Sequence, residues 1–189
     1  MKPIIFSGEM VQAILGGRKT QTRRVFTSRA TAVLLDAGIK YDDLPEAIRN
    51  TAPYKIGDIL WVRETFAKIV SGIKRPSSYY IYRADGKTFD NVKWGSPLYM
   101  PRAAARIFLR VTDVRVERLH DITDADAHAE GMDSPSYPII QFKDLWRELN
   151  DKRGWYSWNS NPRVWVVEFE RVDKLCYNIS ENESIESSV

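Results

Sequence analysis

The chain has 189 residues, of which 43% are hydrophobic and 28% charged, and its formal net charge is +3. A chain of this size can bury one core, so we expect a single domain over residues 1–172. Residues 173–189 hold four acids and one base among many Ser and Asn residues. That composition predicts an acidic, flexible tail.

Composition also excludes several classes of protein. Because the chain has one cysteine, it forms no internal disulfide. Because it has only two histidines in addition to that cysteine, no zinc cluster is expected. We expect no metal and no cofactor. No run reaches the roughly 18 apolar residues that span a bilayer, and the N-terminus lacks the layout of a signal peptide. The sequence therefore predicts a cytoplasmic protein that does not enter the membrane.

The first elements are a short strand over 1–6 and a helix over 7–15. Met10, Val11, Ile14 and Leu15 recur at helical spacing, and Ser7 is placed to cap the helix. Two glycines then end it, because glycine readily adopts the left-handed conformation at a helix C-terminus.

The next residues form the most informative motif of the chain. After the glycines come four cations and two hydroxyls, namely Arg18, Lys19, Arg23, Arg24, Thr20 and Thr22. Such a turn is a candidate anion site that contains possible nucleophiles. In the alternative, Arg18 and Lys19 only satisfy the last helix carbonyls, and Arg23 and Arg24 line a solvated strand edge. Residues 1–30 carry six bases and one acid, which suits a phosphate-bearing partner.

An extended segment over 20–26 and short helices over 32–37 and 45–49 should follow the motif. A turn at 55–58 then precedes a strand over 59–66. Leu60 and Val62 share the core face of this strand with Glu64, while Trp61 and Arg63 share the other. A buried carboxylate needs a cation, so we expect Glu64 to pair with a motif arginine rather than to act in catalysis.

The residue pattern over 79–117 predicts β structure. A hairpin is expected between 79–83 and 88–94 across Asp85 and Gly86. In the long strand over 107–117 the apolar positions change phase near Thr112 and Asp113. A bulge or bend there is typical of small barrels.

The remaining elements are two helices, a loop and a strand. Thr123 and Asp126 form a capping-box pattern, and Gly131 should end that helix. Glu130 then faces the negative end of the helix dipole, so it should be held by a cation or kept protonated. A second helix presents Phe142, Leu145, Trp146 and Leu149 to the core. The aromatic loop over 153–162 either stacks on bases or plugs a barrel, and 164–172 is a strand. These elements predict an α+β fold.

Several motifs resemble the ASCH family, whose domain is a PUA-like small β-barrel associated with RNA. The likeness rests on five stretches: 17–24, 57–64, Met100-Pro101-Arg102, 122–132 and 161–172. The motif Gly-Arg-Lys-Thr-x-Thr-x-Arg is the most specific of them. The chain looks most like the longer, prophage-type members of that family.

A shorter ASCH member removes the acetyl group from N4-acetylcytidine with a lysine, a threonine and a glutamate. The resemblance carries these roles to Lys19, Thr22 and Glu130. Lys19 would activate Thr22 if burial and neighbouring arginines lower its pKa, and Glu130 would protonate the departing amine. Strand alternation puts positions 19 and 22 on opposite faces, so this mechanism requires a loop or bulge between them.

The sequence therefore predicts a protein that engages RNA or a nucleoside, with hydrolysis of an N4-acylated cytidine as its most specific activity. The predicted binding residues are Arg18, Arg23, Arg24, Trp61, Arg63, Glu64 and Arg102. A non-catalytic nucleic-acid-binding module and a ribonuclease remain alternatives. The sequence indicates no oligomeric state.

Overall fold

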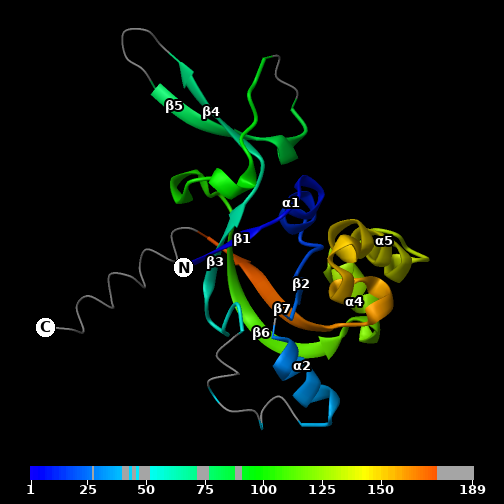
Figure 1. Ribbon diagram of the computed structural model, residues 1–189. Coiled ribbons are helices and arrows are strands. Elements are labelled where there is room, and N and C mark those ends of the chain that lie inside the picture. The colour runs from blue at the N-terminus through cyan, green and yellow to red at the C-terminus, as the bar shows by residue number, and fades with distance from the viewer. Residues whose placement is uncertain are drawn as a thin grey trace, which may run out of the picture. The chain divides into compact units, whose positions relative to one another are not determined.

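The computed structural model describes residues 1–26, 28–39, 43, 46, 52–71, 77–87 and 91–173. The helix expected at 45–49 lies mostly outside these residues, and the tail expected over 173–189 lies outside them except for residue 173. Figure 1 shows the order of the elements along the chain.

Two compact units make up the chain. Unit 1 comprises Met1–Gly17, Asp58–Arg110 and Glu170–Val189, and unit 2 comprises Arg18–Gly57 and Val111–Phe169. The strands β6 (Phe108–Arg118) and β7 (Arg163–Val172) have residues in both units.

In unit 1, strand β1 (Lys2–Ile5) runs parallel to β3 (Ile59–Arg63), which pairs antiparallel with the start of β6. Helix α1 (Gly8–Leu15) begins at Ser7, whose Oγ accepts a hydrogen bond from the Met10 N–H. The helix predicted from this capping residue is confirmed. Its buried residues are Val11, Ala13 and Ile14.

The hairpin of unit 1 differs from the prediction. Strand β5 (Ser77–Tyr82) pairs antiparallel with β4 (Phe66–Ser71), and residues 88–90 of the predicted partner segment lie outside the described residues. The chain after β5 turns into a 3-10 helix, Arg83–Asp85, which ends at Gly86 with φ of 68°. The Asp-Gly signal therefore marks a helix end. Two further 3-10 helices span Pro97–Tyr99 and Arg102–Ala104.

In unit 2, strand β2 (Gln21–Val25) pairs antiparallel with β7. The helices are α2 (Arg29–Asp36), α4 (Asp124–Ala129) and α5 (Pro138–Asn150). The 3-10 helices are Leu119–Asp121, Asp151–Tyr156 and Trp158–Ser160. On α5, Phe142 and Trp146 are buried as predicted, but Leu149 is 58% exposed.

The aromatic loop of unit 2 is partly packed against its neighbours. The Trp158 ring lies 4.7 Å from the His120 ring and 6.3 Å from the Phe142 ring, measured between centroids. Trp155 is 62% exposed. Trp158 therefore belongs to the packing of unit 2, and Trp155 is left at its surface.

The α+β class is confirmed, but a closed barrel is not found among the described residues. Five strands pair in the order β1-β3-β6-β7-β2, and β4 and β5 form a second sheet. At the start of β2, Lys19 Nζ donates to the Gln21 carbonyl, and just before the strand the Thr20 N–H donates to the carbonyl of Ala129 at the end of α4. Within the described ranges, no helix is long and apolar enough to cross a membrane.

Candidate functional site

Lys19 and Glu130 meet in the interior of unit 2, although 111 positions separate them. Lys19 Nζ donates to Glu130 Oε2 and to the Glu130 carbonyl, both at 2.8 Å. A third bond, also 2.8 Å, joins Nζ to the Gln21 carbonyl. The three ammonium donors thus have three acceptors. Lys19 is 3% exposed and Glu130 4%.

The end of helix α4 fixes the position of Glu130. Thr123 begins the helix with the predicted capping box, in which Thr123 and Asp126 each accept from the other's backbone N–H. At the other end, the N–H of Gly131 donates to His128 and that of Met132 to Ala127. This Schellman pattern requires the φ of 100° that Gly131 adopts. The cation expected beside Glu130 is Lys19, which also satisfies the last carbonyl and so complements the helix dipole.

Burial governs the protonation of Lys19. Its removal from water lowers the pKa of the Lys19 ammonium below the usual 10.5. The attraction and hydrogen bond of Glu130 oppose that shift, and the nearby charges of Arg24 and Arg23 reinforce it. A lysine with a lowered pKa that contacts a carboxylate is a candidate for proton transfer.

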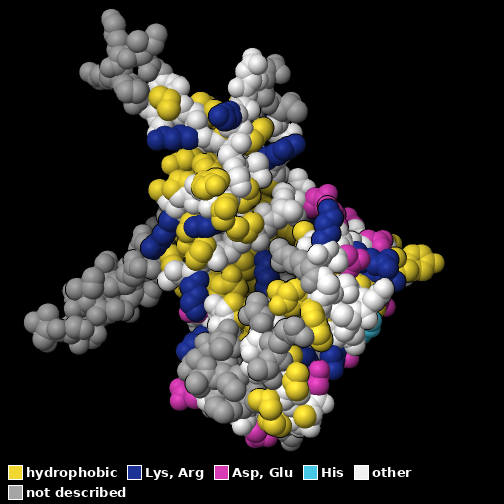
Figure 2. Space-filling view, viewed as in Figure 1, with side chains coloured by type: hydrophobic (Ala, Val, Ile, Leu, Met, Phe, Trp, Pro, Cys, Tyr) yellow, Lys and Arg dark blue, Asp and Glu magenta, His cyan; other side chains and the backbone are white. Residues whose placement is uncertain are grey.

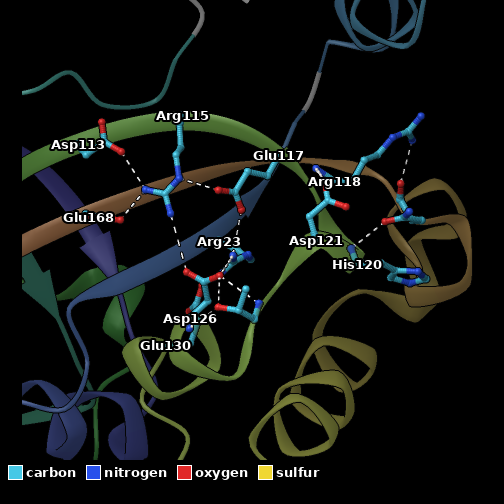
Figure 3. A network of polar contacts seen from close by, with 12 residues as sticks. Arg23, Asp113, Arg115, Glu117, Arg118, His120, Asp121, Asp126, Glu130 and Glu168 are labelled. Carbon is cyan, nitrogen blue, oxygen red and sulfur yellow. Dashed lines mark hydrogen bonds and ion pairs between the residues drawn. The ribbon is translucent and has the colours of Figure 1, made fainter.

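Arg23 lies in the same cluster. Its side chain is fully buried, and its guanidinium is 3.1 Å from Glu117, 3.4 Å from Asp126 and 3.5 Å from Glu130. Figure 3 shows these carboxylates around Arg23, with Arg115 close by. A guanidinium enclosed by three acids is not exposed to phosphates. Arg18 is exposed and Arg24 half-buried.

A second arginine extends the network over the sheet. Arg115 on β6 bonds to Asp113, Glu117 and Glu168, and its Nη2 lies 3.8 Å from Asp126. Burial alone would lower the pKa of Arg115, but the hydrogen bonds of these carboxylates raise it above its usual range. This network was not expected from the sequence. The charged residues that alternate along β6 were the available signal.

Four buried polar atoms of the cluster lack a hydrogen-bond partner among the described residues. They are Gln21 Nε2, Arg23 Nε, Arg23 Nη1 and Glu130 Oε1. Leaving such an atom unsatisfied costs about 1–3 kcal/mol. Two of these atoms, Arg23 Nη1 and Glu130 Oε1, lie 3.5 Å apart in an ion pair, and the Gln21 side chain contributes a hydrogen bond that lowers the pKa of Asp126. Arg23 Nε is therefore the donor of this set that a further polar group could best satisfy.

Thr22 does not join this cluster. It is buried on β2 opposite Val167, whereas its neighbour Arg23 lies opposite Val166. Because side chains alternate along a strand, Thr22 faces the other side of β2 from Gln21 and Arg23. The structure therefore brings together Lys19, Arg23 and Glu130, and it leaves Thr22 apart.

The other predicted binding residues belong to unit 1. Trp61 and Arg63 share a face as expected, and the Arg63 guanidinium lies 4.6 Å from the Trp61 ring centroid. Glu64 is buried, but its cation is Arg106 and not a motif arginine. Two bonds of 2.8 and 2.9 Å join Arg106 to the Glu64 carboxylate. Arg106 lies in the same unit as Glu64, and its guanidinium contacts the Glu64 carboxylate directly. Arg102 is exposed.

Acid titration should reveal the capping box of α4. Burial alone would raise the pKa of Asp126, but hydrogen bonds from Thr123 and the charge of Arg23 lower it below 3.8. The folded state therefore binds the proton less readily than the unfolded state. The ionised Asp126 carboxylate therefore stabilises the folded state in full above pH 3.8, and this contribution is lost as the pH falls through the pKa of Asp126 in the folded protein.

We expect Asp126→Asn to lower the free energy of unfolding by about 0.5–2 kcal/mol at pH 7, the usual range for a lost cap. The deficit relative to the unmodified protein should shrink below pH 4, as measured by urea unfolding from pH 7 to pH 2. Asp124→Asn is the control, because Asp124 lies in the same first turn outside the box. An equal deficit at every pH would contradict the assignment.

No family model matches the chain, and no curated protein matches it. Among solved structures, the chain is similar to protein EF3133 from Enterococcus faecalis V583, described with the family-model DUF984. The two share 14% identity with a TM-score of 0.45, and the match covers 92% of this chain and 82% of that one. Among the described residues, no group of three or more His, Cys, Asp or Glu side chains is arranged to hold a metal ion.

Proposed function

We propose that this chain binds RNA, and that the contact surface is the part of unit 1 around the β4–β5 hairpin. The observation that carries the proposal is a basic surface with exposed aromatic side chains. Between Asp58 and Arg110 the sequence has ten Lys or Arg residues and four Asp or Glu residues. Three of those acids are already paired: Asp58 with Lys2, and Glu64 and Asp85 with Arg106.

The same surface exposes side chains that can stack on bases. Tyr79 is 52% exposed and Tyr99 78%. Lys68, Arg83 and Lys87 are also exposed. Figure 2 shows hydrophobic and cationic side chains interspersed over this region. A groove or surface that combines cations with aromatic rings suits single-stranded nucleic acid, because every base offers a face for stacking. The ASCH resemblance remains part of this proposal.

The test is binding of a fluorescent single-stranded RNA at several salt concentrations. Lys68→Ala/Arg83→Ala should weaken binding and reduce the slope of log K against log salt by about 0.7 for each phosphate that the variant no longer neutralises. Tyr99→Ala should weaken binding roughly 5- to 150-fold, the cost of one missing stack. The control is Arg147→Ala/Lys152→Ala, which removes two exposed cations from unit 2. An equally large effect in the control would contradict the assignment of the surface.

Removal of an acyl group from N4-acylated cytidine is the second candidate, and two observations on unit 2 favour it. Lys19 has a lowered pKa beside Glu130, and the cluster holds polar atoms without hydrogen-bond partners among the described residues. In this proposal Glu130 takes a proton from Lys19, which gives a neutral amine and a carboxylic acid. The amine accepts a proton from water as the water oxygen bonds to the acyl carbon. The acid protonates N4 as the C–N bond breaks, and the original ion pair is restored.

Turnover of N4-acetylcytidine to cytidine and acetate, followed by chromatography, tests this activity. Glu130→Gln should remove it while retaining a side chain of the same size, because an amide cannot supply the acid. Thr22→Val should retain activity, since Thr22 faces away from the cluster. Loss of activity in Thr22→Val with the fold intact would restore Thr22 as the nucleophile.

A further inference from the structure

Unit 2 contains a pocket that lies apart from the cluster of Lys19, Arg23 and Glu130. Its volume is about 110 Å³, and it lies between α2, the end of β6 and the segment that leads into β7. Phe26, Trp155 and Tyr156 contribute aromatic surface to its lining. The Phe26 ring is held 4.7 Å from the Trp165 ring, whereas Trp155 is largely exposed. The pocket thus has a fixed aromatic side chain and an aromatic side chain open to solvent.

Two arginines line the same pocket and converge on one carboxylate. Arg118 Nη2 lies 2.7 Å from Asp36 Oδ1, and Arg163 Nε lies 3.0 Å from the same oxygen. The arginines are otherwise oriented by backbone carbonyls, Arg118 by Asn161 and Arg163 by Leu35. The net charge of Arg118, Arg163 and Asp36 together is therefore +1. Both guanidinium groups face the position of one anionic oxygen, which Asp36 supplies.

The position of Asp36 is explained by these arginines. It is the last residue of α2, where the negative end of the helix dipole disfavours a carboxylate. Its carboxylate is 38% exposed and is held by two cations. An external phosphate would present more acceptor oxygens to the same guanidinium groups.

We infer that this pocket binds the base and phosphate of a pyrimidine nucleotide, and that Asp36 occupies the phosphate position when no ligand is bound. The volume limits the size of the base: an apolar cavity of roughly 150 Å³ accommodates benzene, so a pocket of about 110 Å³ admits no more than one six-membered ring. The aromatic lining supplies stacking, and Arg118 and Arg163 supply phosphate contacts. This inference does not depend on RNA binding by unit 1.

The experiment is isothermal titration of the full chain with four probes: cytidine 5′-monophosphate, cytidine, adenosine 5′-monophosphate and a short oligocytidylate. Cytidine 5′-monophosphate should bind at least about tenfold more tightly than cytidine, because charged hydrogen bonds to the phosphate are absent in the nucleoside. Adenosine 5′-monophosphate should bind more weakly, because its base is larger. If only the oligocytidylate binds, and its binding depends on Arg118 and Arg163, the inferred site is supported and its ligand is a pyrimidine nucleotide within an RNA strand.

Two kinds of variant decide the role of the residues. Arg118→Ala and Arg163→Ala should each weaken binding about tenfold or more. Asp36→Asn should strengthen it several-fold, and a gain of affinity cannot arise from loss of the fold. Lys68→Ala/Arg83→Ala should leave cytidine 5′-monophosphate binding unchanged, which separates this site from the surface proposed on unit 1. The inference is overturned if neither cytidylate probe binds, if the arginine variants bind as well as the unmodified protein, or if Asp36→Asn binds more weakly.

Discussion

Lys19→Met should lower the free energy of unfolding by about 3–5 kcal/mol, the usual cost of leaving one member of a buried ion pair without its partner. Methionine retains most of the volume of lysine, so the loss is mainly electrostatic. Glu130 would keep its position at the end of α4 without its ammonium, and the Gln21 carbonyl would lose its donor. Urea unfolding followed by circular dichroism measures the change.

The double variant Lys19→Met/Glu130→Leu separates the pair from its surroundings. It removes both charges, so it should be clearly more stable than the sum of the two single losses predicts. The matched surface pair is Arg110 and Glu170, whose side chains are 54% and 50% exposed. Arg110→Ala should cost less than about 1 kcal/mol. Additive single effects at positions 19 and 130 would contradict a direct, buried interaction.

Arg106→Ala should have the largest effect in unit 1, about 3–5 kcal/mol. The Glu64 side chain is 1% exposed, and Arg106 binds it with two hydrogen bonds. The same guanidinium lies 2.6 Å from Asp85 and 3.9 Å from the Tyr82 ring centroid. Burial alone would lower the pKa of Arg106, but the hydrogen bonds of Glu64 and Asp85 raise it. Its removal leaves a buried carboxylate without a cation.

Arg106→Lys is the informative control. Lysine keeps the charge but cannot form the two parallel bonds of a guanidinium, so we expect an intermediate loss. Glu64→Gln/Arg106→Met should recover part of the stability that Arg106→Ala loses, because no buried charge then remains. Urea midpoints of the three variants provide the comparison. If Arg106→Ala unfolds at the same midpoint as the unmodified protein, the Glu64 carboxylate has another source of compensation.

Local patterns predicted the local structure well. The Ser7 cap, the Thr123 and Asp126 box and the glycine after Glu130 all lie where their backbone chemistry requires them. The need of Glu130 for a cation followed from its place at a helix end, and Lys19 supplies that cation. These predictions succeeded because each depends on a few neighbouring residues or on one unfavourable charge.

Predictions that depended on long-range pairing were less successful. The Asp-Gly pair favoured a hairpin, but the partner of β5 is β4, and the pattern cannot choose between two strands of similar composition. Glu64 needed a cation, yet composition could not distinguish Arg106 from the motif arginines. Thr22 shows the same limit: strand alternation put positions 19 and 22 on opposite faces, and only the family resemblance placed Thr22 beside Lys19.

The separation of Lys19 from Glu130 also bears on how the protein is synthesised. At about 5–20 residues per second, the ribosome adds the 111 intervening positions in roughly 5–20 s. Throughout that interval the Gly-Arg-Lys-Thr segment has emerged or is emerging while its acidic partner has not yet been made. Unit 2 also needs β7, which pairs with β2. Its interior therefore forms only after β7 has been translated, and the early basic segment lacks its acidic partner until then.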